Sequence, residues 1–188
     1  GRGVYSRPDG VGAYVVNTSH AALQERFGLR LGLADAVTWG ELSRGRGWAV
    51  PAGVSADAAV VQILDPATGT GTFLLRVIGV IHATMMAEYE GAGWDAARCV
   101  EAGRGYVREH LLPRIFGLEL LVAPCVICHL RLALALERTG FVFGGGAGER
   151  LRVVRTDTLQ IGEEGEDEWV KRRAPISVIV GNPPYERE

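Results

Sequence analysis

Apolar residues recur at helical spacing in some stretches of this chain and form short, β-branched runs in others. The spacing predicts helices at 9–27, 72–89, 94–112 and 121–138, and the short runs predict strands at 60–64, 114–118, 151–154 and 176–180. Residues 28–55 have no clear period, so irregular structure is expected there. The acidic and then basic segment 163–173 is interpreted as a solvated loop.

Strands and helices alternate in this pattern, which predicts an α/β domain with a mostly parallel sheet and right-handed crossovers. Ligands of such sheets bind beyond the carboxyl ends of the strands. Polar residues fall at these ends, namely Asp65, Glu119, Asp157 and Asn182. We therefore expect them to line one crevice. The N-terminal helical and irregular segment is assigned to 1–55 and the core domain to 56–188.

The composition suits one well-buried domain, because 47% of the 188 residues are apolar and 22% are charged. A formal net charge of -2 gives no general attraction to nucleic acid, so a DNA substrate would have to be gripped by another part of the protein. The three cysteines form no disulfide pattern, and no apolar run is long enough to span a membrane. A cytoplasmic location is expected.

Gly69-Thr70-Gly71 follows the strand predicted at 60–64 and precedes the helix predicted at 72–89. Glycines at such a turn let the backbone bend sharply and approach a ligand, with the N–H groups of the next helix facing it. The pattern alone fits a ligand-binding turn and a tight structural turn equally well. A P-loop is excluded, because Lys followed by Ser or Thr is absent after the glycines.

The longer segment Asp65-Pro66-Ala67-Thr68-Gly69-Thr70-Gly71-Thr72-Phe73-Leu74 resembles motif I of adenine-N6 DNA methyltransferases. The resemblance implies a Rossmann-like sheet that binds S-adenosyl-L-methionine, with the turn against its methionine part. A side chain at Gly71 would then occupy the space of that moiety. Glu119 resembles the motif II acid, which accepts hydrogen bonds from the ribose hydroxyls, and Asp157-Thr158 resembles motif III, whose acid accepts from the adenine amino group. Tyr5-Ser6-Arg7-Pro8 resembles motif X, which closes the pocket.

These matches together give the expected cofactor-binding set: Tyr5, Asp65, Pro66, Ala67, Gly69, Gly71, Thr72, Phe73, Glu119, Asp157 and Thr158. The separation of Asp65 from Glu119 far exceeds the roughly 20 residues usual between a Rossmann turn and its ribose acid. The helix predicted at 94–112 would account for the excess.

Asn182-Pro183-Pro184-Tyr185 resembles motif IV, the catalytic motif of the same family. An adenine amino nitrogen is a poor nucleophile, because its lone pair is delocalised into the ring. Acceptors at the Asn182 side chain and the Pro183 carbonyl would localise that lone pair toward the methyl group. The prolines would fix the carbonyl direction, and Tyr185 would stack on a base rotated out of the duplex. The alternative is a Pro-Pro turn that ends a strand.

The motif order resembles that of large single-chain restriction–modification enzymes, and implies a site-specific adenine-N6 methyltransferase acting on double-stranded DNA. The sheet is then expected to be truncated after its fourth strand, the chain to be a fragment, and the fragment to have little activity alone. Two alternatives stay open. One is a protein glutamine N5-methyltransferase, which also uses Asn-Pro-Pro-Tyr, and the other is a module that binds the cofactor without catalysis.

Cys125-Val126-Ile127-Cys128-His129 matches the Cys-x-x-Cys-His pattern of haem attachment. It lies inside an apolar helical pattern, where small thiols suit a packed face. We expect these residues to be structural, and no metal site is predicted.

Overall fold

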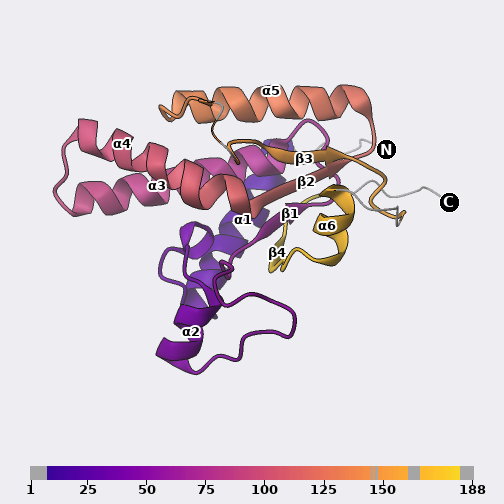
Figure 1. Cartoon of the computed structure of the whole chain (residues 1–188). Coiled ribbons are helices and arrows are strands. Elements are labelled where there is room, and N and C mark those ends of the chain that lie inside the picture. The colour runs from indigo at the N-terminus through magenta and orange to yellow at the C-terminus, as the bar shows by residue number, and fades with distance from the viewer. Residues whose placement is uncertain (1–7, 145, 147, 161–165, 183–188) are drawn as a thin grey trace, which may run out of the picture.

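The computed structural model describes residues 8–182 except 145, 147 and 161–165, and its centre is a parallel β-sheet (Figure 1). The sheet has four strands in the order β3-β2-β1-β4. The strands are β1 (Ile63–Asp65), β2 (Ile115–Glu119), β3 (Arg152–Arg155) and β4 (Val178–Ile179). All three pairings are parallel. The predicted α/β class, with a Rossmann-like parallel sheet, is confirmed.

Helices connect the strands, as the hydrophobic spacing predicts. Helix α3 (Thr72–Gly91) follows β1, and α5 (Val122–Arg138) connects β2 to β3. The segment predicted as one helix at 94–112 begins as α4 (Ala96–Tyr106) and continues through a π-helical turn (Val107–Leu111) and a 3₁₀ turn (Leu112–Arg114) into β2. This extra helical segment accounts for the long separation of Asp65 from Glu119.

Both faces of the sheet are covered, which explains why every residue of β2 is buried. On one face, Leu74 and Ile78 of α3 and Leu132 of α5 belong to the main core. On the other face, Phe116 and Leu118 of β2 form a second core with residues near the C-terminal end of the described chain. Figure 1 shows α5 and α6 on opposite sides of the sheet.

Helix α6 (Glu166–Arg172) replaces the solvated loop expected at 163–173, so that expectation was wrong for its helical part. Charge dominates the segment, but its apolar residues fix its place. Val170 is only 2% exposed, and the Trp169 ring lies 5.8 Å from that of Phe116. Two adjacent apolar anchors, flanked by charged residues on both sides, are enough to dock one short helix on the sheet.

A second helix was missed in the stretch expected to be irregular. Helix α2 (Trp39–Arg46) begins at a capping box, in which Thr38 accepts from the Glu41 N–H and the Glu41 side chain accepts from the Thr38 N–H. It ends at Gly47 in the left-handed conformation. The Thr-x-x-Glu spacing was present in the sequence and is a recognised start signal.

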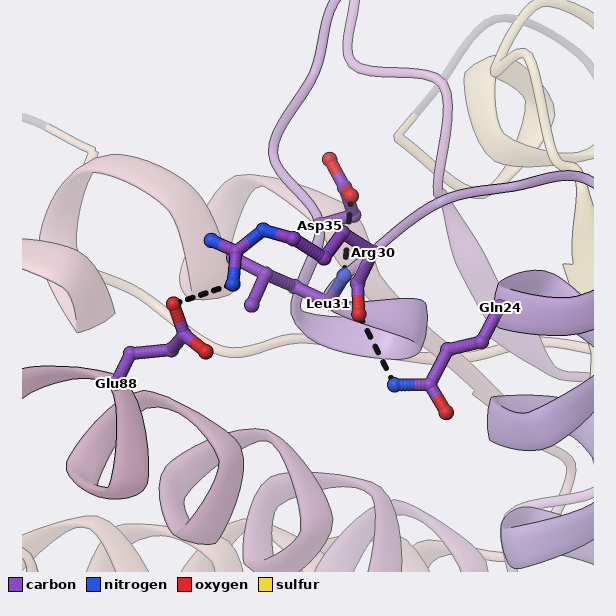
Figure 2. A network of polar contacts seen from close by, with 5 residues as sticks. All are labelled: Gln24, Arg30, Leu31, Asp35 and Glu88. Atoms are coloured by element: carbon purple, nitrogen blue, oxygen red, sulfur yellow. Dashed lines mark hydrogen bonds and ion pairs between the residues drawn. The ribbon is translucent and has the colours of Figure 1, made fainter. Parts of the chain in front are cut away.

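The N-terminal helix α1 (Pro8–Glu25) confirms the helix predicted at 9–27 and packs against α3. Polar contacts tie the segment that follows α1 to α3 and back to α1 (Figure 2). Arg30 forms an ion pair with Glu88 at 2.6 Å, and the Arg30 carbonyl accepts from Gln24 at 3.0 Å. The Leu31 N–H donates to Asp35 at 3.2 Å. Val16, Leu29 and Leu33 also belong to the main core, so residues before β1 share that core with the sheet domain.

Helix α5 exposes an apolar stripe on the side facing away from the sheet. Its members are Val122, Val126, Ile127, Leu130 and Leu134, with Leu120 and Leu121 just before the helix. Even so, no helix among the described residues is both long and apolar enough to cross a membrane.

Candidate functional site

The parallel sheet brings the predicted polar positions to one edge. Asp65 and Glu119 are the last residues of β1 and β2, Asp157 follows β3, and Asn182 follows β4. The strand order also creates a switch point. The chain passes from β1 to β2 and β3 in one direction, and β4 then pairs with β1 on its other side. A crevice outside the carboxyl ends at such a point is where open α/β sheets bind ligands.

The turn between β1 and α3 is held to the end of β2. Thr68 donates to the Leu118 carbonyl from its N–H at 2.9 Å and from its hydroxyl at 2.7 Å. Gly69 and Gly71 both have positive φ, +54° and +85°, a region that side chains disfavour. The turn is therefore fixed in position before any ligand binds.

The two glycines serve different purposes. A Cβ at Gly69 would meet no atom within 4 Å, whereas a Cβ at Gly71 would lie 2.8 Å from Cys128 Sγ of α5. A Cβ at Gly71 would therefore meet α5, and the expected contact of Gly71 with a ligand stays a prediction. Gly71 permits close packing of the turn against α5, and it is Gly69 that has open space around it.

Glu119 links the turn to the start of α5. Its Oε2 accepts from the Gly69 N–H at 2.7 Å, and its Oε1 accepts from the Leu121 N–H at 2.9 Å. The side chain is 9% exposed. Since a carboxylate has about four acceptor positions, these two bonds leave capacity for a ligand. The contact with Gly69 places Glu119 beside the turn despite the long separation in sequence.

Asp65 is the most unusual group at this edge. It is 0% exposed, its Oδ1 accepts from the Ala67 N–H at 3.1 Å, and its Oδ2 has no hydrogen-bond partner. Burial raises the pKa of Asp65 to about 6, the Ala67 N–H opposes this, and the nearby Glu119 charge adds to it. A buried carboxylate oxygen without a partner is costly, so it is a candidate ligand contact.

The loop after β3 is tied to both of the preceding strand ends. The Thr156 N–H donates to the Glu119 carbonyl at 2.8 Å, and the Thr158 hydroxyl donates to the Pro66 carbonyl at 2.6 Å. Asp157 accepts from the Leu159 N–H at 2.9 Å, which closes a local turn. Thr158 is thus attached to the motif I segment, and Asp157, the other residue expected to bind the adenine end, is its neighbour in the chain.

Asn182 lies at the other side of Asp65. The Val180 N–H donates to the Leu64 carbonyl at 2.9 Å, and a Cβ at Gly181 would lie 2.8 Å from Asp65 Oδ1. Gly181 therefore lets β4 pass close to the Asp65 carboxylate, and Asn182 emerges exposed. Pro183, Pro184 and Tyr185, as well as Tyr5, lie outside the described residues.

The Cys-x-x-Cys-His segment forms part of the packing of α5. Cys125 and Cys128 are buried free thiols, and burial raises the pKa of Cys128 to about 12. The His129 Nε2 pairs with the Val153 carbonyl at 2.8 Å. Within the described part of the chain, no group of three or more His, Cys, Asp or Glu residues could hold a metal ion.

Two cations that the sequence analysis did not single out support the site. Arg131 of α5 donates from Nη1 to both the carbonyl and the hydroxyl of Thr70, each at 2.8 Å. Lys171 of α6 donates to the loop that carries Asp157. A lone Arg inside the apolar pattern of α5 was a usable signal, whereas Lys171 lay in a charged segment that offered none.

No protein-family model and no curated protein matches this chain. Solved structures do share its fold. The Type ISP restriction–modification enzyme LlaBIII bound to DNA matches with 21% identity and a TM-score of 0.59, covering 99% of this chain and 11% of that one. A nuclease-deletion mutant of the Type ISP enzyme LlaGI with a DNA substrate mimic matches at 22% and 0.58, covering 97% and 13%. A DrdV–DNA complex matches at 23% and 0.58, covering 98% and 14%. This chain therefore spans only a small part of each.

Proposed function

We propose that this domain binds S-adenosyl-L-methionine and, within a restriction–modification enzyme, transfers its methyl group to N6 of adenine in double-stranded DNA. The observation that carries the proposal is the buried Asp65 Oδ2 without a partner, at the switch point of the sheet. S-adenosylmethionine carries an ammonium and a sulfonium group, and a cationic ligand would satisfy that oxygen. The neighbouring turn and Glu119 supply the acceptors and backbone approach that the rest of the cofactor needs.

Each described residue has a distinct part in this proposal. Gly69 has the open space that a ligand lying close to the backbone requires. Glu119 accepts from the ribose hydroxyls with its remaining lone pairs while it holds the Gly69 N–H. Asp157 and Thr158, attached to Pro66 through the Thr158 hydroxyl, form the adenine end of the pocket. Pro66, Ala67, Thr72 and Phe73 shape the turn and the first turn of α3.

The catalytic part belongs to the segment that begins at Asn182. Bound S-adenosylmethionine supplies an electrophilic methyl group on sulfur. The Asn182 side-chain oxygen and the Pro183 carbonyl accept from the two N6 hydrogens of the target adenine, so that the N6 lone pair points toward the methyl carbon. Pro184 helps to hold this geometry, and Tyr185 stacks on the flipped base. The N6–methyl bond would form in line as the methyl–sulfur bond breaks, so that S-adenosylhomocysteine leaves as the neutral thioether and one N6 proton is released to solvent, with no covalent enzyme intermediate.

Two observations support DNA as the partner. Each of the three solved structures named above is a complex with DNA or a DNA mimic. Asn182 is exposed at the edge of the sheet, where a base leaving a duplex could reach it. The net charge of -2 implies that other parts of the longer polypeptide hold the phosphate backbone.

Calorimetry with S-adenosylhomocysteine tests the cofactor site. We expect the 188-residue chain to bind it, and Glu119→Gln to weaken binding by about tenfold, because a charged acceptor is replaced by a neutral one. Glu137→Gln, at the exposed end of α5, is the matched control and should bind like the parent. The absence of binding by the parent chain would remove the proposed function.

Transfer of a labelled methyl group tests the substrate. A longer polypeptide that contains this domain should label duplex DNA on adenine and leave a release-factor protein unlabelled. The reverse result would favour the glutamine N5-methyltransferase alternative. Cofactor binding without transfer to either substrate would leave only a binding module.

A further inference from the structure

Lys171 of α6 makes hydrogen bonds to three oxygens in one short segment of chain. Its Nζ donates to Thr156 Oγ1 at 2.9 Å, to the Asp157 carbonyl at 2.7 Å and to the Gln160 carbonyl at 2.7 Å. An ammonium group has three N–H donors, so one Lys side chain can bond to several oxygens at once. The segment 156–160 contains both Asp157 and Thr158.

The second core fixes the position of α6, the helix that carries Lys171. The adjacent Val170 is 2% exposed, and Trp169 contacts Phe116 of β2. The Arg173 N–H donates to the Trp169 carbonyl at 2.8 Å, which closes the last turn of the helix. These contacts fix the backbone of Lys171 relative to the sheet, and the hydrogen bonds of its ammonium group hold the end of the side chain.

Other contacts of the described residues also hold the segment 156–160. The Thr156 N–H reaches the Glu119 carbonyl and the Thr158 hydroxyl reaches Pro66, as described above. Within the segment, the Leu159 N–H donates to Asp157 Oδ1 at 2.9 Å and the Gln160 N–H returns to the Asp157 carbonyl at a long 3.3 Å. Lys171 joins the two ends of this turn, because it bonds to Thr156 and Gln160 at once.

We propose that Lys171 is a positioning residue that sets the orientation of Asp157 and thereby the selectivity of the pocket for a 6-amino purine. The proposal rests on the proposed function, in which Asp157 accepts from the adenine amino group. Lys171 does not touch the ligand. It holds the backbone of Asp157 through the carbonyl of that residue, so its loss lets the acceptor turn away from the purine edge.

The test compares two ligands by calorimetry, S-adenosylhomocysteine and S-inosylhomocysteine, in which the 6-amino group is replaced by oxygen. We expect the parent chain to prefer the first by about tenfold or more, because the second leaves the carboxylate without a donor. Lys171→Met should bring the ratio of the two dissociation constants close to one. Lys171→Arg, with a larger head group, should restore only part of the ratio.

Arg173→Met is the matched control, since it removes one exposed positive charge from the end of the same segment. It should leave the ratio unchanged. Asp157→Ala should lower the ratio as Lys171→Met does, and the double variant should lower it no further, as expected when one residue acts through the other.

A purely structural role predicts that both dissociation constants rise together in Lys171→Met while their ratio stays at the parent value. That result would overturn the proposal, as would failure of both Lys171 variants to fold. If the parent binds neither ligand, the proposed function itself fails. If the parent binds both equally, the cofactor site stands and the role of Lys171 in selectivity is wrong.

Discussion

Replacement of Asp65 by Asn should make the unliganded fold more stable at neutral pH while weakening ligand binding. Burial raises the pKa of Asp65 from an ordinary 3.8 to about 6 in the folded chain. A tenfold change in acidity corresponds to about 1.36 kcal/mol, so charging this group in the fold costs about 3 kcal/mol. Asn keeps an oxygen that can accept from the Ala67 N–H and carries no charge.

The raised pKa of Asp65 determines whether the stability of the fold rises or falls with pH. Between pH 4 and 6 the folded state binds the proton more tightly than the unfolded state, so stability that is present below pH 4 is lost as pH rises through 6. The Asp65→Asn variant has no carboxyl proton to release, so it does not lose this stability as pH rises. Urea unfolding from pH 4 to 8 should therefore show the difference in unfolding free energy, variant minus parent, rising by about 3 kcal/mol and levelling off above pH 6.

Groups other than Asp65 titrate in both proteins and cancel in that difference. Asp57→Asn, which removes an exposed carboxylate, is the matched control and should give a nearly flat difference. A flat difference for Asp65→Asn as well would refute the assignment of a buried, destabilised carboxylate. Calorimetry completes the test, because the affinity of the parent for S-adenosylmethionine should increase as pH rises through about 6, whereas that of the variant should be weaker and nearly independent of pH over this range.

Further predictions concern packing and catalysis. In urea unfolding, Gly69→Ala should destabilise the chain by roughly 1 kcal/mol, the strain of a left-handed side chain, and Gly71→Ala should destabilise it by clearly more. Adding Cys128→Ala to Gly71→Ala should recover part of that additional loss of stability. Equal destabilisation by the two glycine replacements would contradict the contact with Cys128 Sγ. Replacing Cys125 and Cys128 together by Ala should lower stability through lost packing and leave cofactor affinity unchanged, and a haem band or bound metal in the purified parent would disprove the structural role. Asn182→Ala, in a longer polypeptide that methylates DNA, should lower methyl transfer by about a hundredfold with cofactor affinity retained, and unaltered turnover would refute its catalytic role.

Local sequence signals were sufficient for most of the framework. The β-branched run before Asp65 and the apolar helical period after Gly71 predict β1, the turn and α3, because each depends on neighbours along the chain. Alternation of strands with helices then restricts the sheet to a parallel arrangement. The gathering of Asp65, Glu119 and Asp157 at one edge follows from that arrangement.

Signals were missed where charge obscured the pattern or where a short motif was overlooked. Helix α6 depends on Val170 and Trp169 docking on β2, and neither residue stands out between acidic and basic neighbours. The capping box at Thr38 and Glu41 was readable and marks the start of α2. The functions assigned to all of the expected site residues remain predictions.

The sequence by itself thus determined which residues end the strands, because hydrophobic periodicity and the glycine turn are local properties of the chain. Only the tertiary structure decided what surrounds them. Asp65 is buried with its Oδ2 unpaired and β4 passing beside it at Gly181, and burial raises its pKa. Gly71 is required because α5 brings Cys128 against the turn, and Lys171 reaches the Asp157 loop because α6 docks on the opposite face. These contacts join residues far apart in the chain, so they arise only once the strand order and the helix packing are set.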